Sequence, residues 1–316
     1  MLYDLVSKDF DFNTETTFEN GLYSIIKLSQ ETLVPSNDPV NDTNVGYLYL
    51  PKNIKSHKPV IVVHGMGSRN LPHLSYYTRK FASRGIPSIM PILPYHYDRA
   101  GKGDAFGRPF LLDDMDDSIR DFRQAVVDIR ALLEVLVRMG VSDGNFSLIT
   151  FSFGGMIGVI LMGVEDKIKE GVFVATGGNY RYITWESLAT RTLRKKYEIQ
   201  SNNLVYGCNK EKCIQLHKDY AMFLGKISSA LDIESLNFPK GCYLFDPLTF
   251  APLLKGRKVL IYRALFDEII PKEATEELWK YAGKPRMKTL FSDHYLTILY
   301  RKMIFEDATK LFGGDL

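Results

Sequence analysis

The sequence predicts an α/β protein with a mostly parallel sheet and helices on both faces of that sheet. Strand-like and helix-like segments alternate along the 316 residues, and helices are the usual connections between parallel strands. Residues 59–65 (PVIVVHG) form a continuous apolar run, which is typical of a strand covered on both faces. Residues 113–139 form the clearest helix, with an apolar face at three- and four-residue spacing that comprises Ile119, Phe122, Val126, Ile129, Leu133 and Leu136.

The remaining elements follow the same alternation. Asp113 or Asp114 is expected to cap the helix over 113–139, and the acids that follow favour the positive end of its dipole. Short β-branched and aromatic runs predict the strands, and amphipathic stretches predict the helices. We expect strands at 46–51, 86–93, 146–152, 170–176, 258–266 and 287–291, and helices at 75–85, 154–165, 272–283 and 295–312.

One segment interrupts this alternation. Residues 178–245 follow a strand but contain no clear further strand, and they are rich in Tyr, Trp, Arg and Lys. An insert at this position would lie over the carboxyl edge of the strands, where open α/β sheets bind ligands. We therefore expect an α/β core in residues 1–177 and 246–316, and a helical cap in residues 178–245 that closes a small core of its own with its aromatic side chains facing the site.

Composition and charge exclude several classes of protein. The formal net charge is +3 and the basic residues are mixed with acidic ones, so nucleic acid is not an expected partner. No apolar run is long enough to predict a membrane span, and the N-terminus lacks the pattern of a signal peptide. The three cysteines, Cys208, Cys213 and Cys242, are then expected to be reduced thiols of a cytoplasmic protein.

A serine, an acid and a histidine each follow a predicted strand. Ser152 stands between the strand 146–152 and the glycine-rich start of the next helix. Asp267 follows the strand 258–266, and His294 follows the strand 287–291. A serine hydroxyl is a poor nucleophile until a base removes its proton and a third group orients that base. The interval from Ser152 to Asp267 accommodates the cap, and the interval from Asp267 to His294 holds one helix and one strand.

A loop with backbone N–H donors is the fourth expected part of such a site. His64-Gly65-Met66-Gly67 follows the buried strand 59–65 and can present the Met66 N–H to a developing oxyanion. The Phe153 N–H, at the start of the helix after Ser152, would be the second donor. His64 itself is expected to brace this loop with its ring.

These motifs resemble those of the α/β-hydrolase superfamily from about residue 45 to the C-terminus. The resemblance implies Ser152 as nucleophile, Asp267 as acid, His294 as base, and Met66 and Phe153 as oxyanion donors. The chain departs from the family's G-x-S-x-G pattern at Thr150, where a glycine is usual. Pro94-Tyr95-His96-Tyr97-Asp98-Arg99, followed by FRQAVVDIR, also resembles a poorly characterised branch of hydrolase-domain proteins, which implies no substrate.

A cationic loop follows the strand 86–93. His96, Arg99, Lys102 and Arg108 lie there, at the edge of the sheet that should carry the site. They could recognise a carboxylate or phosphate of the substrate, or they could be solvated or paired with the acids at 113–117. Asp246, before Pro247, is expected to cap a helix, and the C-x₄-C spacing of Cys208 and Cys213 lacks the further ligands of a zinc site.

The sequence favours a serine hydrolase that cleaves a small-molecule carboxylic ester through an acyl-enzyme, without metal or cofactor. A peptidase or a thioesterase on the same three residues remains open, and so does a binding protein on a retained hydrolase fold. The identity of the ester and the oligomeric state do not follow from the sequence.

Overall fold

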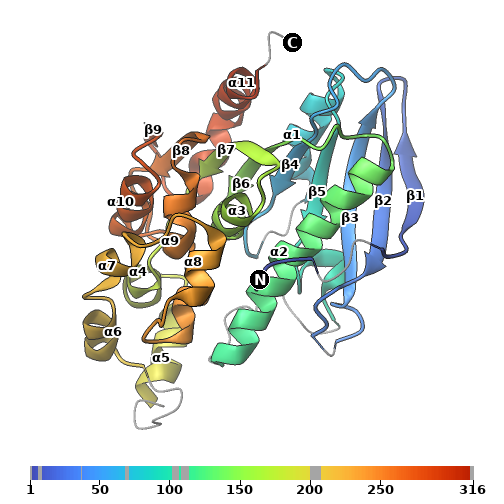
Figure 1. The fold of residues 1–316 in the computed structure, drawn as a ribbon. Helices are drawn as coiled ribbons and strands as arrows, with labels where there is room; N and C mark the ends of the chain where they lie inside the picture. Colours follow the sequence, from blue (N-terminus) through green and yellow to red (C-terminus); the bar gives the residue numbers. More distant parts are fainter. Residues whose placement is uncertain are drawn as a thin grey trace.

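A single nine-stranded sheet organises the chain (Figure 1). The computed structural model describes residues 2–5, 9–36, 38–67, 71–101, 107, 114–199 and 208–313. Within these residues the strands are ordered β1-β2-β3-β5-β4-β6-β7-β8-β9. Their bounds are β1 Asn13–Glu19, β2 Tyr23–Glu31, β3 Thr43–Pro51, β4 Val60–Val63, β5 Ser88–Ile92, β6 Phe146–Phe151, β7 Ile168–Val174, β8 Lys258–Ala264 and β9 Arg286–Leu290.

The strands β5, β4, β6, β7, β8 and β9, in sheet order, run parallel to one another. The pairs β1–β2, β2–β3 and β3–β5 are antiparallel. The predicted strands and the mostly parallel α/β fold are therefore confirmed. The sequence did not predict β1 and β2. All seven residues of β1 are exposed, so this edge strand lacks the apolar alternation that marks a half-buried strand.

Helices cover both faces of the sheet, and alternate strand residues contact opposite layers. In β4, Ile61 and Val63 join a large cluster beneath α2 (Met115–Arg138) and α3 (Phe153–Val164). Val60 and Val62 join a second cluster on the other face, beneath α1 (Leu71–Ala82) and α11 (Arg301–Leu311). The apolar run is thus buried on both sides, as its sequence predicts.

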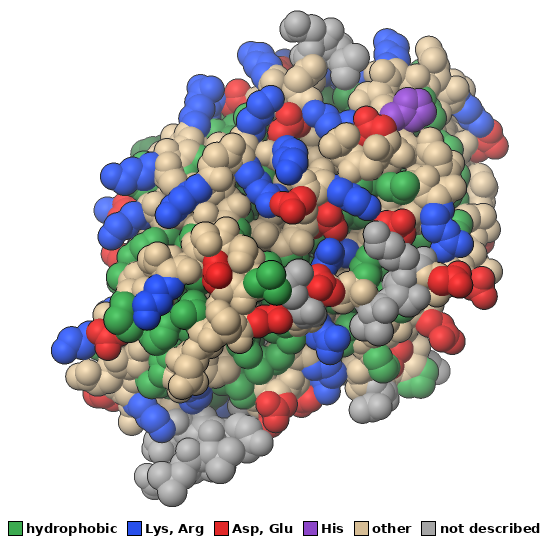
Figure 2. All heavy atoms as spheres, in the orientation of Figure 1, with side chains coloured by type: hydrophobic (Ala, Val, Ile, Leu, Met, Phe, Trp, Pro, Cys, Tyr) green, Lys and Arg blue, Asp and Glu red, His purple; other side chains and the backbone are tan. Residues whose placement is uncertain are grey.

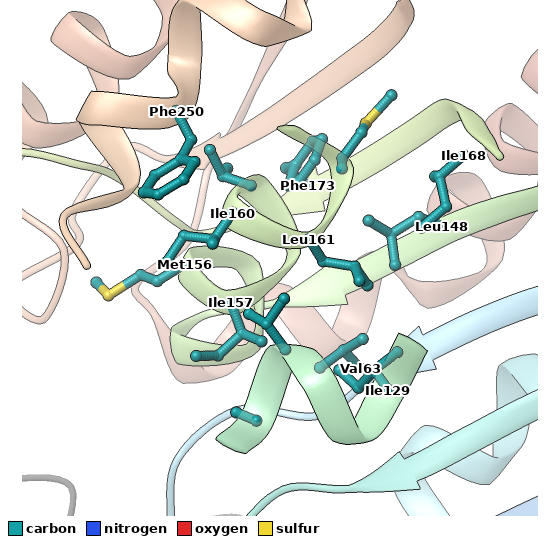
Figure 3. Close-up of a cluster of buried hydrophobic side chains, with 14 of the residues drawn as sticks. Val63, Ile129, Leu148, Met156, Ile157, Ile160, Leu161, Ile168, Phe173 and Phe250 are labelled. Carbon is teal, nitrogen blue, oxygen red and sulfur yellow. The ribbon is translucent and has the colours of Figure 1, made fainter. Parts of the chain in front are cut away.

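Helix α3 lies at the centre of the larger cluster (Figure 3). Its side chains contact the sheet through Leu148 and Phe173, and Ile129 of α2 lies in the same cluster. Helix α2 begins after Asp114, whose carboxylate accepts hydrogen bonds from the N–H groups of Asp116 and Asp117, so the expected N-cap is confirmed. This packing holds the start of α3, and with it Ser152, between the sheet and α2.

The segment expected to be a cap is helical where the structure describes it. It contains α4 (Tyr180–Glu186), α5 (Arg191–Ile199), α6 (Lys210–Leu216), α7 (Tyr220–Leu224), α8 (Ala230–Ser235) and a 3₁₀ turn, η3 (Gly241–Leu244). It is followed by α9 (Pro247–Phe250), a 3₁₀ turn η4 (Ala251–Leu254), β8, α10 (Lys272–Tyr281), β9 and a 3₁₀ turn η5 (Tyr295–Tyr300), while a short 3₁₀ turn η1 (Tyr97–Arg99) follows β5.

The prediction that the cap closes a core of its own is wrong. Several of its buried side chains belong to the same cluster as α2, α3 and the sheet: Ile183, Tyr220, Leu224, Ile227, Ile233 and Tyr243. The Tyr220 hydroxyl also forms a hydrogen bond with the Thr249 hydroxyl of α9, and the Thr249 hydroxyl donates to the Tyr243 carbonyl. Because their apolar contacts are continuous, we expect the cap helices and the sheet to unfold together. The boundaries of the cap at residues 178 and 245 remain a prediction.

Truncation of the central helix layer should be costly. Ile129 is 2% exposed within the larger cluster, so Ile129→Ala should lower the free energy of unfolding by about 2–4 kcal/mol, from lost burial and a residual cavity. Leu231→Ala, at an exposed position of α8, is the matched control and should change it by less than about 0.5 kcal/mol. Urea unfolding of both variants measures the difference, and equal effects would contradict this account of the core.

Candidate active site

Three side chains from three strand ends form one hydrogen-bonded line. Ser152 follows β6, Asp267 follows β8 and His294 follows β9. The His294 Nε2 atom lies 2.8 Å from the Ser152 Oγ, and the His294 Nδ1 atom lies 2.9 Å from the Asp267 Oδ2. Because the carboxylate can only accept, Nδ1 carries the proton and Nε2 is left to accept the serine hydroxyl proton. The structure thus brings together all three residues that the sequence selected.

The backbone at Ser152 is strained. Its φ is +53° and its ψ is −123°, a conformation that non-glycine residues rarely adopt, and its N–H donates to the Val174 carbonyl of β7 at 2.8 Å. Such a sharp strand-to-helix turn lifts the hydroxyl above the sheet edge. The strain persists because β6 and α3 are both held by buried contacts.

A glycine inside α3 accommodates the threonine that departs from the family pattern. Thr150 is fully buried at the end of β6, and its hydroxyl donates to the Val172 carbonyl at 3.4 Å. A Cβ at Gly158 would lie only 2.6 Å from the Thr150 Cγ2, so only a glycine at 158 leaves room for that methyl group. In this chain the small residue that permits the close approach of α3 to β6 stands on the helix, opposite Thr150 on the strand.

Asp267 and His294 are held by their own neighbours. The Asp267 Oδ1 also accepts hydrogen bonds from the N–H groups of Ile269 and Ile270, at 2.9 and 2.8 Å. The Asp267 side chain is 6% exposed and the His294 side chain 10% exposed. These bonds fix the carboxylate, which in turn fixes one tautomer of the histidine ring.

The loop after β4 runs beside Ser152. A Cβ at Gly65 would lie 3.2 Å from the Ser152 Cβ, so the absence of a side chain there permits the contact. Met66 lines the same pocket as Ser152, and Phe153 is the first residue of α3, at the positive end of its dipole. The assignment of the Met66 and Phe153 N–H groups as oxyanion donors remains a prediction.

Two buried histidines support this loop. The His64 Nε2 accepts a hydrogen bond from the Leu93 N–H, so its Nδ1 carries the proton and donates to the Gly65 carbonyl at 2.9 Å. The His96 Nε2 accepts from the Gly67 N–H at 3.4 Å, and its Nδ1 donates to the Pro94 carbonyl. Burial, with smaller contributions from the neighbouring His96 and the Arg99 charge, lowers the pKa of His64 to about 3. Burial, with a smaller contribution from the Arg99 charge, lowers the pKa of His96 to about 4. Both rings are neutral at physiological pH.

The prediction that Arg99 and His96 contact the substrate is wrong. Both are fully buried, and neither lines the pocket that contains Ser152. The Arg99 guanidinium donates to the Asn41 and Ile92 carbonyls and pairs with Asp128 of α2 at 2.7 Å. Its charge is satisfied within the protein and ties the start of β3 to β5 and α2. Arg108 and Lys102 lie outside the described residues.

Other expectations concern side chains near the site. Asp246 caps α9 through the Leu248 N–H, as expected, and it also accepts from the Asn179 and Tyr180 N–H groups at the start of α4. The Cys208, Cys213 and Cys242 thiols are free. No group of three or more metal-ligating side chains occurs among the described residues. Within the same part of the chain, no helix combines the length and apolar character needed to cross a membrane.

A pocket of about 250 Å³ opens at Ser152 and His294. Its walls come from the start of α2, from α3, from the cap helices α4 and α5, and from the segment before α9. Phe122 and Met156 lie in helices that the sequence predicts, but the sequence does not place them in this pocket. Helical spacing identifies the buried face of a helix. Which residues of that face border a cavity is decided only where α2, α3 and the cap meet.

The architecture and the position of these residues at the strand ends define the α/β-hydrolase fold. Similar solved structures include an acetyl xylan esterase from Paenibacillus sp. R4, with a TM-score of 0.66, 13% identity, and coverage of 94% of this chain and 88% of that one. A cold-adapted esterase from an Arctic intertidal metagenomic library has a TM-score of 0.59 at 14% identity, with coverage of 95% and 98%. A puromycin-hydrolyzing peptidase of Mycobacterium tuberculosis has a TM-score of 0.59 at 17% identity, with coverage of 95% of this chain and 41% of the peptidase. No protein-family model and no curated protein matches the sequence.

The contact between Thr150 and Gly158 can be tested by a double-mutant cycle. Gly158→Ala should destabilise the protein by about 1–3 kcal/mol, because the new methyl group overlaps the Thr150 Cγ2. Thr150→Ser removes that methyl group and keeps the hydroxyl, so it should recover most of the loss in the double variant. Urea unfolding of the four proteins gives the coupling energy, and additive effects would refute the proposed compensation.

The neutral histidines predict a loss of stability in acid. The unfolded chain protonates His64 and His96 near the ordinary pKa of 6.5, whereas the folded chain does so only near 3 and 4. Their contribution is therefore complete above pH 6.5 and is lost as the pH falls toward 4. In urea unfolding between pH 7 and 4.5, His64→Gln should reduce this loss, whereas His57→Gln, at an exposed position, should not. Equal pH dependence in the wild type and His64→Gln would contradict the assignment.

Proposed function

We propose that the protein is a serine hydrolase that cleaves a carboxylic ester through an acyl-enzyme, with Ser152 as nucleophile, His294 as base and Asp267 as the residue that orients the base. One observation carries the proposal: the Ser152 hydroxyl lies 2.8 Å from a histidine nitrogen whose opposite nitrogen is bonded to a buried carboxylate. The strained backbone of Ser152 supports it, since strain of this kind is typical of functional sites.

In the first half of the reaction His294 takes the proton of the Ser152 hydroxyl as the oxygen attacks the ester carbonyl carbon. The resulting tetrahedral oxyanion would accept hydrogen bonds from the Met66 and Phe153 N–H groups. His294 then gives its proton to the alcohol oxygen, the C–O bond breaks, and the alcohol leaves. The acyl group remains bonded to Ser152.

In the second half a water molecule replaces the alcohol. His294 takes one proton from the water, whose oxygen attacks the acyl carbon. When the bond to Ser152 breaks, the proton returns to the serine oxygen and the carboxylic acid is released. Asp267 stabilises the imidazolium formed in each half. The sequence of steps needs no cofactor.

The similar structures include esterases and a peptidase, so the fold alone does not select the substrate bond. We propose an ester because an alcohol leaves more readily than an amine, and hydrolysis of an ester therefore demands the least of the site. A matched ester and amide of the same acid, compared by kcat/KM, would distinguish the two chemistries. The expected order is ester above amide.

Removal of the Ser152 hydroxyl should abolish hydrolysis of an activated acyl ester while the fold is retained. Ser152→Ala should lower kcat by at least about a thousandfold, because the three residues act as a unit. An active-site fluorophosphonate should label the wild type at Ser152 and leave Ser152→Ala unlabelled. The control Ser228→Ala should keep both ester hydrolysis and labelling. Wild-type turnover by folded Ser152→Ala would refute the mechanism. A wild type that neither turns over nor reacts with the probe would instead indicate a binding protein on a hydrolase fold.

A further inference from the structure

The pocket at Ser152 borders a second chamber. This chamber has a volume of about 300 Å³ and lies between the start of α2, α4 and the segment from Lys240 to Cys242. The two cavities share five lining residues, which form the wall between them: Met115, Tyr180, Thr184, Tyr197 and Cys242. Trp185 and Cys213 line the second chamber alone, as do the charged residues Asp116 and Lys240. A substrate that starts at Ser152 therefore has space ahead of it beyond the first pocket.

The first pocket is suited to an uncharged, apolar group. Its walls include Phe122, Phe153, Met156, Ile183, Leu193 and Phe245. Apart from His294, Asp114 is the single ionisable acid or base of Asp, Glu, Lys, Arg or His type among its described lining residues. The Asp114 carboxylate is already bonded to two N–H groups of α2. Since the described lining residues include no Lys or Arg, they offer a carboxylate or phosphate no cation to compensate for its lost hydration.

The entrance of the pocket is also apolar. Tyr295 lines the pocket beside His294 and is 74% exposed. Phe291 and Leu299, on the same segment as Tyr295, are 75% and 74% exposed, and the Phe291 ring contacts that of Phe266, the residue before Asp267. Exposed apolar side chains therefore lie close to His294 along the chain. Over the face drawn in Figure 2, acidic and basic side chains are interspersed.

We propose that the substrate is a neutral ester with an aliphatic chain longer than acetyl, and that this chain fills the pocket at Ser152 and extends past Thr184 and Cys242 into the second chamber. The proposal rests on the hydrolase function proposed above and adds the class of group that the site accepts. The chain belongs either to the acid or to the alcohol of the ester, since both share the same chemistry.

A series of esters measures the preference. Each methylene that leaves water for an apolar pocket contributes about a fourfold increase in binding. The kcat/KM for 4-nitrophenyl octanoate should therefore exceed that for the acetate by at least tenfold, and a hemisuccinate ester, which adds a carboxylate, should be poorer than the butyrate. Methyl octanoate compared with octyl acetate shows which side of the ester holds the chain. The proposal would be overturned if a longer chain raised kcat/KM on neither side of the ester, neither from 4-nitrophenyl acetate to the octanoate nor from methyl acetate to octyl acetate.

Substitution at the shared wall tests the second chamber. Thr184→Phe places a ring between the two cavities and should lower the octanoate-to-acetate ratio of kcat/KM at least fivefold. Met222→Phe, at an exposed position of α7, is the matched control and should leave the ratio unchanged. Cys242→Ala widens the same passage and should raise the ratio for dodecanoate relative to octanoate. If neither wall variant changes the ratios, the chain does not enter the second chamber.

A binding experiment separates this proposal from the catalytic one. In Ser152→Ala protein, methyl dodecanoate should change the fluorescence of Trp185, and Trp185→Phe should remove that change while Trp279 still emits. Methyl acetate at the same concentration should have no effect. Binding without hydrolysis by the wild type would overturn the proposed function and support the chain site. Hydrolysis without any Trp185 response or chain preference would overturn the chain site and leave the proposed function intact.

Discussion

The close approach of α3 to β6 is the constraint on which the candidate site depends. Ser152 can hold a φ of +53° only because the strand before it and the helix after it are fixed by buried contacts on both sides. The Thr150 methyl group fills the space left by Gly158, so the two elements meet without a void. The strained turn and the position of the hydroxyl both follow from this contact.

Charges are arranged differently on the two sides of the loop after β4, behind it in the protein interior and in front of it in the pocket at Ser152. Behind it, Arg99 is buried with Asp128, and its charge helps to keep His64 and His96 neutral. Neutral rings can each accept one backbone N–H and donate one N–H, which is what holds the loop beside Ser152. In front of it, the pocket is largely apolar. Of the basic side chains that the sequence places near the site, the two that the structure describes, His96 and Arg99, therefore contribute to its support and not to its surface.

The continuous core of the cap and the sheet has consequences for the pocket. Tyr220 and Tyr243 pack in the same cluster as α3, while Tyr180 and Phe245 pack on Phe122 of α2. The walls of the pocket are thus built from the same contacts that stabilise the fold. Substitutions there will combine effects on stability and selectivity.

The sequence by itself determined the order of elements and the three residues at strand ends. Strand and helix periodicities are local, and Ser152, Asp267 and His294 each stand directly after a recognisable strand, so the parallel sheet brings them to one edge. The tertiary structure alone decided which neighbours each side chain meets. From the sequence, Arg99 is interpreted as a possible substrate contact because it lies in a loop after a strand, at the edge of the sheet that carries the site. The structure instead buries it, paired with Asp128 of α2. The role of Gly158, the continuity of the cap with the core and the second chamber likewise depend on contacts between residues far apart in the chain, which no local pattern records.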